Sequence, residues 1–118
     1  MNKAFFWLAL IVLAELTVAP ASQAQNPAEG KKLYSTYCST CHGETGKGDG
    51  PSAKFLKTPP SDLSDAKWDR GSTDGELFLV IRNGAGPNFD MKPNKVLKDD
   101  EIWNIVNYVR SLGPQTKK

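Results

Sequence analysis

Apolar residues recur at helical spacing in three stretches of the chain, residues 27–37, 74–83 and 99–112. No run of alternating apolar and polar residues gives a convincing strand. The pattern therefore predicts three amphipathic helices joined by loops, with their apolar faces packed in a core. The apolar positions are Leu33, Tyr34 and Tyr37 in the first helix, Leu77, Phe78, Val80 and Ile81 in the second, and Ile102, Ile105, Val106, Val109 and Leu112 in the third.

Capping residues mark the ends of these helices. Asn26 precedes the first helix and is a good N-cap. Thr73 and Glu76 form the capping-box pattern that opens the second helix, and Gly84 ends it. Gly113 is the stop signal of the third helix. The boundaries are thus predicted by local backbone chemistry as well as by periodicity.

Residues 43–51 contain too many glycines for a helix or a strand and are predicted to form a loop. A phosphate-binding P-loop is rejected because Gly48 follows Lys47 and no strand precedes the segment. We interpret the glycines as letting the backbone pass close to a large flat ligand. Residues 52–72 are predicted to be loop with short helical turns. Trp68 lies in that segment, and its indole N–H would need a partner if buried.

The N-terminus has the layout of a secretory signal. Lys3 precedes an apolar run at residues 4–14, and small residues follow as far as Ala24. We predict cleavage after Ala24, with Ala21 as the second choice. Glu15 interrupts the apolar run and makes it too short for a membrane span.

The predicted signal peptide, residues 1–24, leaves one small domain at residues 25–118. Such a chain buries only a thin core by itself, and a large apolar cofactor would supply part of the missing volume. The net charge of the whole chain is +2, and no dense basic run is present, so nucleic acid binding is not expected. Export predicts a periplasmic location without stable membrane insertion after cleavage.

The chemistry of the chain centres on Cys38, Cys41 and His42, which form the Cys-x-x-Cys-His pattern of covalent c-type haem attachment. Two thiols add across the haem vinyl groups, and the adjacent imidazole can ligate the iron. These are the only two cysteines and the only histidine in the chain. The sequence therefore predicts one covalent haem (heme c).

Three other kinds of site use similar residues. A thioredoxin-like dithiol needs a βαβ context, which the pattern does not give. A structural zinc ion needs four ligands, and no fourth is evident. A structural disulfide is possible in an exported chain, but it does not account for the histidine.

Beyond this motif, the chain after the signal resembles the monohaem class I cytochromes c of bacteria. The resemblance rests on residues 38–43, on the Gly-Lys-Gly-Asp-Gly-Pro run at 46–51, on Met91 in a Pro-containing loop, and on residues 102–103 and 108–112 near the end. The chain departs from many relatives at Lys92, where Pro is common, and at Lys98, where Ser or Thr is common.

The resemblance implies an all-α fold, with helices wrapped around one covalently bound haem. It implies that His42 is the proximal iron ligand and that Met91, the only methionine after the signal, is the distal ligand. It also implies that the carbonyl of Pro51 accepts a hydrogen bond from His42, and that Asn94 can hydrogen-bond the ligand sulfur. Gly30 and Tyr34 match first-helix positions that cross the last helix near Ile105 and Tyr108.

A His/Met-ligated iron has no open coordination position, so the expected function is one-electron transfer to redox partner proteins, by a monomer that is not an enzyme. The thioether ligand raises the reduction potential. Lys47, Lys54, Lys92, Lys95 and Lys98 are expected to form a basic rim that attracts an acidic partner. One alternative is a haem-bearing subunit of a larger oxidoreductase. Another is a small haem peroxidase or gas sensor, which would need an open distal site.

Overall fold

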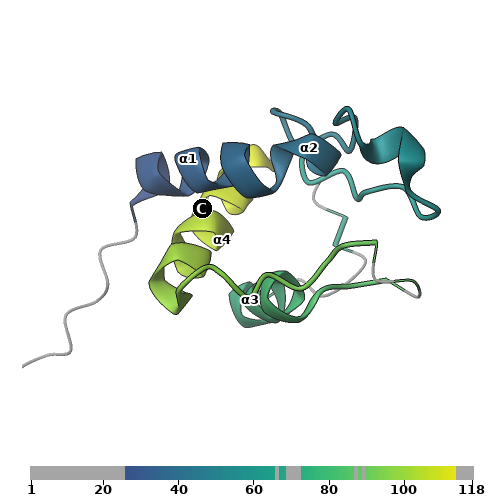
Figure 1. The fold of residues 1–118 in the computed structure, drawn as a ribbon. Helices are drawn as coiled ribbons and strands as arrows, with labels where there is room; N and C mark the ends of the chain where they lie inside the picture. Colours follow the sequence, from purple (N-terminus) through teal and green to yellow (C-terminus); the bar gives the residue numbers. More distant parts are fainter. Residues whose placement is uncertain (1–25, 66, 69–72, 87, 89, 114–118) are drawn as a thin grey trace, which may run out of the picture.

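The computed structural model describes residues 26–65, 67–68, 73–86, 88 and 90–113. The elements in chain order are α1 (Pro27–Tyr37), α2 (Ser39–His42), the 3₁₀ helix η1 (Ala53–Phe55), α3 (Asp74–Asn83) and α4 (Asp99–Leu112) (Figure 1). Within the described residues, the extended pairing consists of one isolated antiparallel bridge between Ala85 and Met91. The fold is therefore all-α, as predicted.

The caps predicted from sequence are confirmed. The Asn26 Oδ1 atom accepts hydrogen bonds from the backbone N–H groups of Ala28 and Glu29 at 3.1 and 3.2 Å. The Thr73 hydroxyl accepts the Glu76 N–H at 3.2 Å, and the Glu76 carboxylate accepts the Thr73 N–H at 2.9 Å. These bonds satisfy amide groups that have no partner inside the helix, so the helices begin where these residues stand.

The start of α4 retains half of a capping box although Lys98 occupies the N-cap position. The backbone N–H of Lys98 donates to the Glu101 carboxylate at 2.8 Å. Asp99 and Asp100 add negative charge to the first turn. This charge stabilises the helix because the N-terminal end of the helix dipole is positive. The helix therefore begins at the predicted residue without a Ser or Thr cap.

Helix α1 crosses α4 at close range (Figure 1). A Cβ atom at Gly30 would overlap the backbone carbonyl of Asn104 and lie 3.0 Å from the Cβ of Tyr108. One turn later, the rings of Tyr34 and Tyr108 meet edge-on with centroids 5.2 Å apart. The crossing implied by the family resemblance is thus confirmed, because glycine allows the two backbones to touch.

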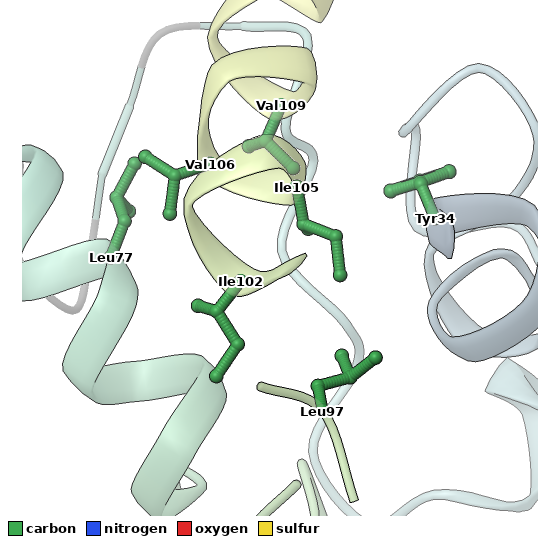
Figure 2. Packing of buried hydrophobic residues seen from close by; sticks show 7 residues of the cluster. All are labelled: Tyr34, Leu77, Leu97, Ile102, Ile105, Val106 and Val109. Atoms are coloured by element: carbon green, nitrogen blue, oxygen red, sulfur yellow. The ribbon is translucent and has the colours of Figure 1, made fainter. Parts of the chain in front are cut away.

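The core lies between α4 and the two helices that flank it. Figure 2 shows the apolar face of α4 between Leu77 of α3 and Tyr34 of α1. Leu97, in the loop before α4, is 4% exposed and belongs to the same cluster. The cluster consists of Tyr34, Leu77, Leu97, Ile102, Ile105, Val106 and Val109.

Several predicted core positions are less buried than expected. Leu33, Phe78, Val80 and Ile81 are only partly buried. Leu112 is only partly buried against the cluster. Tyr37 is 47% exposed, so the prediction that it packs in the core is wrong. It occupies the last turn of α1, where the chain turns into α2, and its ring borders a cavity instead.

No helix in the described part of the chain is both long and apolar enough to span a lipid bilayer. The predicted signal peptide lies outside the described residues.

Candidate cofactor site

A cavity of about 370 Å³ lies between α1, α2, α3, α4 and the loops that join them. This volume falls within the range of small-molecule and cofactor pockets, roughly 300–1,000 Å³. Apolar side chains from all four helices line it, and they suit a large apolar ligand. Every candidate site residue except Pro51 borders this cavity: Cys38, Cys41, His42, Met91 and Asn94.

Helix α2 explains how the haem-attachment motif reaches the cavity. Cys38 ends α1 and caps α2, and its carbonyl accepts the His42 N–H at 2.9 Å and the Cys41 N–H at 3.3 Å. One helical turn therefore separates Cys38 from the other two residues, which places all three on one face of the turn. Both thiols are free and line the cavity.

Burial changes the acid–base behaviour of one of these thiols. The pKa of Cys38 is raised to about 12, first by burial and second by the nearby Cys41. In the free chain this thiol therefore stays protonated, and a protonated thiol is a poor nucleophile.

The ring of His42 is oriented by a backbone carbonyl. Its Nδ1 atom lies 3.1 Å from the carbonyl oxygen of Ser61. Because a carbonyl only accepts, Nδ1 carries the proton and Nε2 keeps a lone pair for a metal. Burial lowers the pKa of His42, and the bond to Ser61 opposes that change only in part. The imidazole is therefore held in the neutral form that ligates iron.

The predicted hydrogen bond from His42 to Pro51 is wrong. Pro51 is exposed and borders a separate surface pocket together with Thr40 and Gly50. The residue before Pro51 is held against α2, because the Gly50 N–H donates to the carbonyl of Cys41 at 3.0 Å. This bond keeps Pro51 at the carbonyl end of α2, whereas His42 lines the main cavity.

The Gly-rich loop approaches the protein's own backbone, and no residue from 43 to 51 lines the main cavity. The interpretation that its glycines make room for a ligand is therefore wrong. Its amides, together with that of Ser52, satisfy carbonyls of α2 that lack partners within so short a helix. The bonds are Ser52 N–H to Thr40 O at 2.9 Å, Gly50 N–H to Cys41 O at 3.0 Å, and Gly48 N–H to His42 O at 2.7 Å.

A buried tyrosine reinforces the same turn. The Tyr34 hydroxyl donates to the carbonyl of Gly43 at 2.7 Å. The Tyr34 side chain is fully buried, and its pKa is raised chiefly by that burial. Gly43 itself has a φ of 79°, a left-handed conformation that glycine adopts without strain. The residue after His42 is thus fixed by α1.

Met91 lies on the loop between α3 and α4 and is partly buried. Its backbone carbonyl accepts the Ala85 N–H at 3.0 Å. A Cβ atom at Gly84 would lie 2.5 Å from that carbonyl oxygen, so only glycine permits this approach. The structure places Met91 at the cavity with His42, and its role as a ligand stays a prediction.

Asn94 also borders the cavity, and its side chain stabilises the turn before α4. Its Oδ1 atom accepts the N–H groups of Val96 and Leu97 at 3.1 and 2.9 Å. The predicted hydrogen bond from Asn94 to the ligand sulfur stays a prediction. Trp68 lines the cavity as well, with the Arg110 guanidinium 5.1 Å from its ring centre.

Two residues of the site were missed from the sequence. Ser61 acts through its backbone carbonyl, which gives no signal in residue type. Arg82 bonds the segment that follows Met91. A basic residue in the last turn of a helix is a usual signal for contact with free carbonyls, but it does not reveal which segment supplies them.

The family model that describes cytochrome c matches residues 27–113. The chain is 34% identical over 116 residues to the cbb3-type cytochrome c oxidase subunit FixP of Bradyrhizobium diazoefficiens, covering 90% of this chain and 37% of that protein. It is 32% identical to the subunit CcoP of Cereibacter sphaeroides, covering 73% of this chain and 27% of that protein. The chain thus spans about a third of the length of the curated relatives it matches.

Two solved structures are similar in fold. A chain of the Kuenenia stuttgartiensis reducing HAO-like protein complex superimposes with a TM-score of 0.65 and 31% identity, over 85% of this chain and 48% of that one. The KustC0563 c-type cytochrome superimposes with a TM-score of 0.59 and 30% identity, over 72% of this chain and 98% of that one.

Proposed function

Because the chain belongs to the cytochrome c family, whose members hold haem c covalently and transfer electrons through it, we propose that it is a periplasmic one-electron carrier. In this proposal His42 and Met91 are the two axial ligands of the iron. The proposal rests chiefly on one observation. The attachment motif and Met91, far apart in sequence, border the same cavity.

The residues present fit the cofactor. The thiols of Cys38 and Cys41, free in this structure, would hold it covalently, and the neutral imidazole of His42 would offer Nε2 to the metal. When bound, the haem iron supplies a one-electron couple. Ser61 keeps the His42 ring oriented, as the partners of metal-bound histidines commonly do. The apolar cavity lining excludes water, and the Met91 thioether favours the reduced iron.

Occupation of both axial positions separates a carrier from an enzyme. With His42 and Met91 both bound to the iron, no coordination site would remain for oxygen or peroxide, and the haem would supply single-electron transfer. A peroxidase or gas sensor would keep one position open. Reduced protein that binds carbon monoxide readily at neutral pH would favour those functions over the carrier.

The location in the periplasm is supported by the signal layout of residues 1–24. We further propose that the mature protein is a monomer that docks transiently on its redox partners. N-terminal sequencing of the protein from a periplasmic extract tests the location, and a mature terminus at Gln25 is the expected result.

The charges beside the cavity suggest what kind of partner docks. Lys67 and Lys92 are exposed and border the cavity. Lys95 and Lys98 follow in sequence and are also exposed. Lys47, in the loop after α2, is exposed but does not border the cavity. A partner with an acidic surface is therefore proposed, with association that weakens as salt rises. Lys92→Gln should slow electron transfer about twofold at low ionic strength, and a rate independent of salt would remove this proposal.

The axial ligation is tested by Met91→Ala. The oxidised wild-type protein should show the weak far-red band of an iron–thioether bond, and the variant should lose it. The potential should fall by roughly 0.1–0.3 V, within the range of about 0.8 V that axial ligands span. Met91→His is the control that keeps six ligands, and it should also lower the potential. A band and potential unchanged in Met91→Ala would show that the distal ligand is another residue.

A second candidate is a haem-bearing subunit of a larger oxidoreductase. It is favoured by the relatives, which are named as subunits of cbb3-type oxidases and are about three times as long as the matched region. Gel filtration of the protein from its native source separates the two candidates. Elution at the size of one chain supports the carrier, and coelution with a larger complex supports the subunit.

A further inference from the structure

We propose that Arg82 is a positioning residue that holds the segment carrying Met91 against the end of α3, and so sets how firmly Met91 is kept at the iron. The inference rests on the proposed function, in which Met91 is the distal ligand. It assigns a role to a side chain that lies outside the haem motif and that does not itself line the cavity.

Three hydrogen bonds from one guanidinium support this role. The Nη1 atom of Arg82 donates to the carbonyl of Asn94 at 3.1 Å and to the carbonyl of Leu97 at 2.7 Å. The Nη2 atom donates to Asp99 Oδ1 at 2.6 Å. Arg82 therefore holds the loop that leads from Met91 into α4 at Asn94 and Leu97, and holds the first residue of α4 at Asp99.

The environment of Arg82 makes its carbonyl contacts the stronger part of this network. The Arg82 side chain is 22% exposed, whereas that of Asp99 is 76% exposed. Solvent and salt screen an exposed ion pair, which typically contributes little. Leu97 is 4% exposed, so the bond to its carbonyl is shielded by the core. The Phe78 ring centre lies 5.8 Å from the Arg82 guanidinium carbon and supports its position.

Backbone bonds at the end of α3 act together with Arg82. The Ile81 carbonyl accepts the Asn94 N–H at 3.0 Å, and the Ala85 N–H donates to the Met91 carbonyl at 3.0 Å. Residues 81–85 thus hydrogen-bond the segment from Met91 to Leu97 at three of its residues, Met91, Asn94 and Leu97. A thioether is a weak ligand, so its retention depends on how rigidly its backbone is held.

Arginine suits this position for a geometric reason. Its planar fork presents several donors in fixed directions, whereas lysine offers a compact ammonium on a flexible stem. Arg82→Lys keeps the charge and cannot reach both carbonyls and Asp99 at once. The matched control is Arg110→Lys. Arg110 Nε bonds Asp74 at 2.7 Å, and so also links α3 to α4, but at the first residue of α3 rather than at its end.

The test is a titration of the oxidised holoprotein with imidazole, which competes with Met91 and removes the far-red band. Arg82→Lys should bind imidazole about tenfold more tightly than wild type, since it loses hydrogen bonds from a charged donor. Arg110→Lys should differ from wild type by less than twofold. Asp99→Asn should change the affinity by less than threefold, because the carbonyl contacts remain.

A second measurement separates positioning from general stability. In urea, a positioning role lowers the midpoint at which the far-red band disappears more than the midpoint of helix loss by circular dichroism. Equal shifts of both midpoints, or equal imidazole affinities for Arg82→Lys and Arg110→Lys, would overturn the inference while leaving Met91 as the ligand. A wild-type protein that lacks the far-red band would overturn the proposed ligation, and the role of Arg82 with it.

Discussion

On one side of the cavity, residues 38–42 are bonded to the loop that directly follows them in sequence. We call this side the α2 wall. On the other side, residues 91–97 are held by the end of α3 and form what we call the Met91 wall. The α2 wall has its carbonyls satisfied by backbone amides and would be tied to the haem by two covalent bonds. The Met91 wall depends on Arg82, on two backbone bonds and on a single weak ligand.

This difference indicates which properties a substitution on each wall can change without unfolding the protein. Changes on the α2 wall should alter folding and cofactor attachment together, because the same short segment serves both. Changes on the Met91 wall should alter ligation and reduction potential while the fold persists. The two walls can be tested against each other with matched substitutions.

The largest effect is expected from the double variant Cys38→Ala and Cys41→Ala. Without its covalent tethers the chain should lose the haem, and with it much of a thin core, because ligand binding and folding are linked. Denaturing mass spectrometry should show wild-type chain plus one haem, and variant chain alone. The thermal transition seen by circular dichroism should broaden or vanish in the variant. A haem-free variant that melts as sharply as wild type would contradict this expectation.

The next largest effect is expected when one glycine from each side is replaced by alanine. These are Gly84 at the Met91 wall and Gly48 beside the α2 wall. Their φ angles are 77° and 78°, and an added Cβ would lie 2.5 Å from Met91 O and 2.6 Å from Pro60 O respectively. Strain and crowding should lower the free energy of unfolding by about 4 kcal/mol in each alanine variant. The far-red band should weaken only in Gly84→Ala. Loss of the band in both would show that the walls are not independent.

A smaller effect is expected from Gly30→Ala, which acts on the scaffold shared by both walls. The new Cβ meets the backbone carbonyl of Asn104, so α1 and α4 must move apart. The free energy of unfolding should fall by about 3 kcal/mol in urea denaturation. Gly75→Ala is the control, because its Cβ would have no neighbour within 4 Å. It should leave stability unchanged or raise it by up to about 1 kcal/mol.

The smallest effect is expected from Tyr34→Phe, which removes the hydroxyl bonded to Gly43. A buried carbonyl left without its donor costs about 1–3 kcal/mol. Tyr37→Phe is the control, since Tyr37 is 47% exposed and should change stability by less than about 0.5 kcal/mol. Urea denaturation at neutral pH measures both.

The same tyrosine predicts a dependence on pH. Burial raises the pKa of Tyr34 above that of an unfolded tyrosine, about 10. Above that pH the unfolded chain releases a proton that the folded chain retains, so stability falls as pH rises. The fall between pH 9 and pH 11 should be smaller in Tyr34→Phe than in wild type. Parallel curves for the two proteins would remove Tyr34 as the cause.

The helices could be predicted because their ends depend on local chemistry. Asn26, Thr73 and Gly84 stand at boundaries that the structure confirms. The attachment motif could be predicted because two cysteines and a histidine one helical turn apart have few other uses. The all-α fold followed from the family resemblance and is confirmed by the structure.

The errors concern backbone partners and exposure, which residue types do not encode. Any residue has a carbonyl, so nothing distinguished Ser61 from Pro51 as the acceptor for His42. The glycines of residues 43–51 signalled a close approach correctly, but the approach is to the chain itself. Tyr37 shares the apolar face of α1 in sequence, yet it is 47% exposed, whereas α4 packs against that face at Gly30 and Tyr34.

The crossing of α1 and α4 has a consequence for the order of events during biosynthesis. Residues 27–37 and 99–112 lie near opposite ends of the described chain. Their contact requires closure of a long loop, which costs entropy and slows folding. A chain still being made has no α4 to cover α1, and its Cys38 thiol is not yet buried. We therefore expect a window in which an attachment enzyme can reach Cys38, and this window closes when the last helix docks.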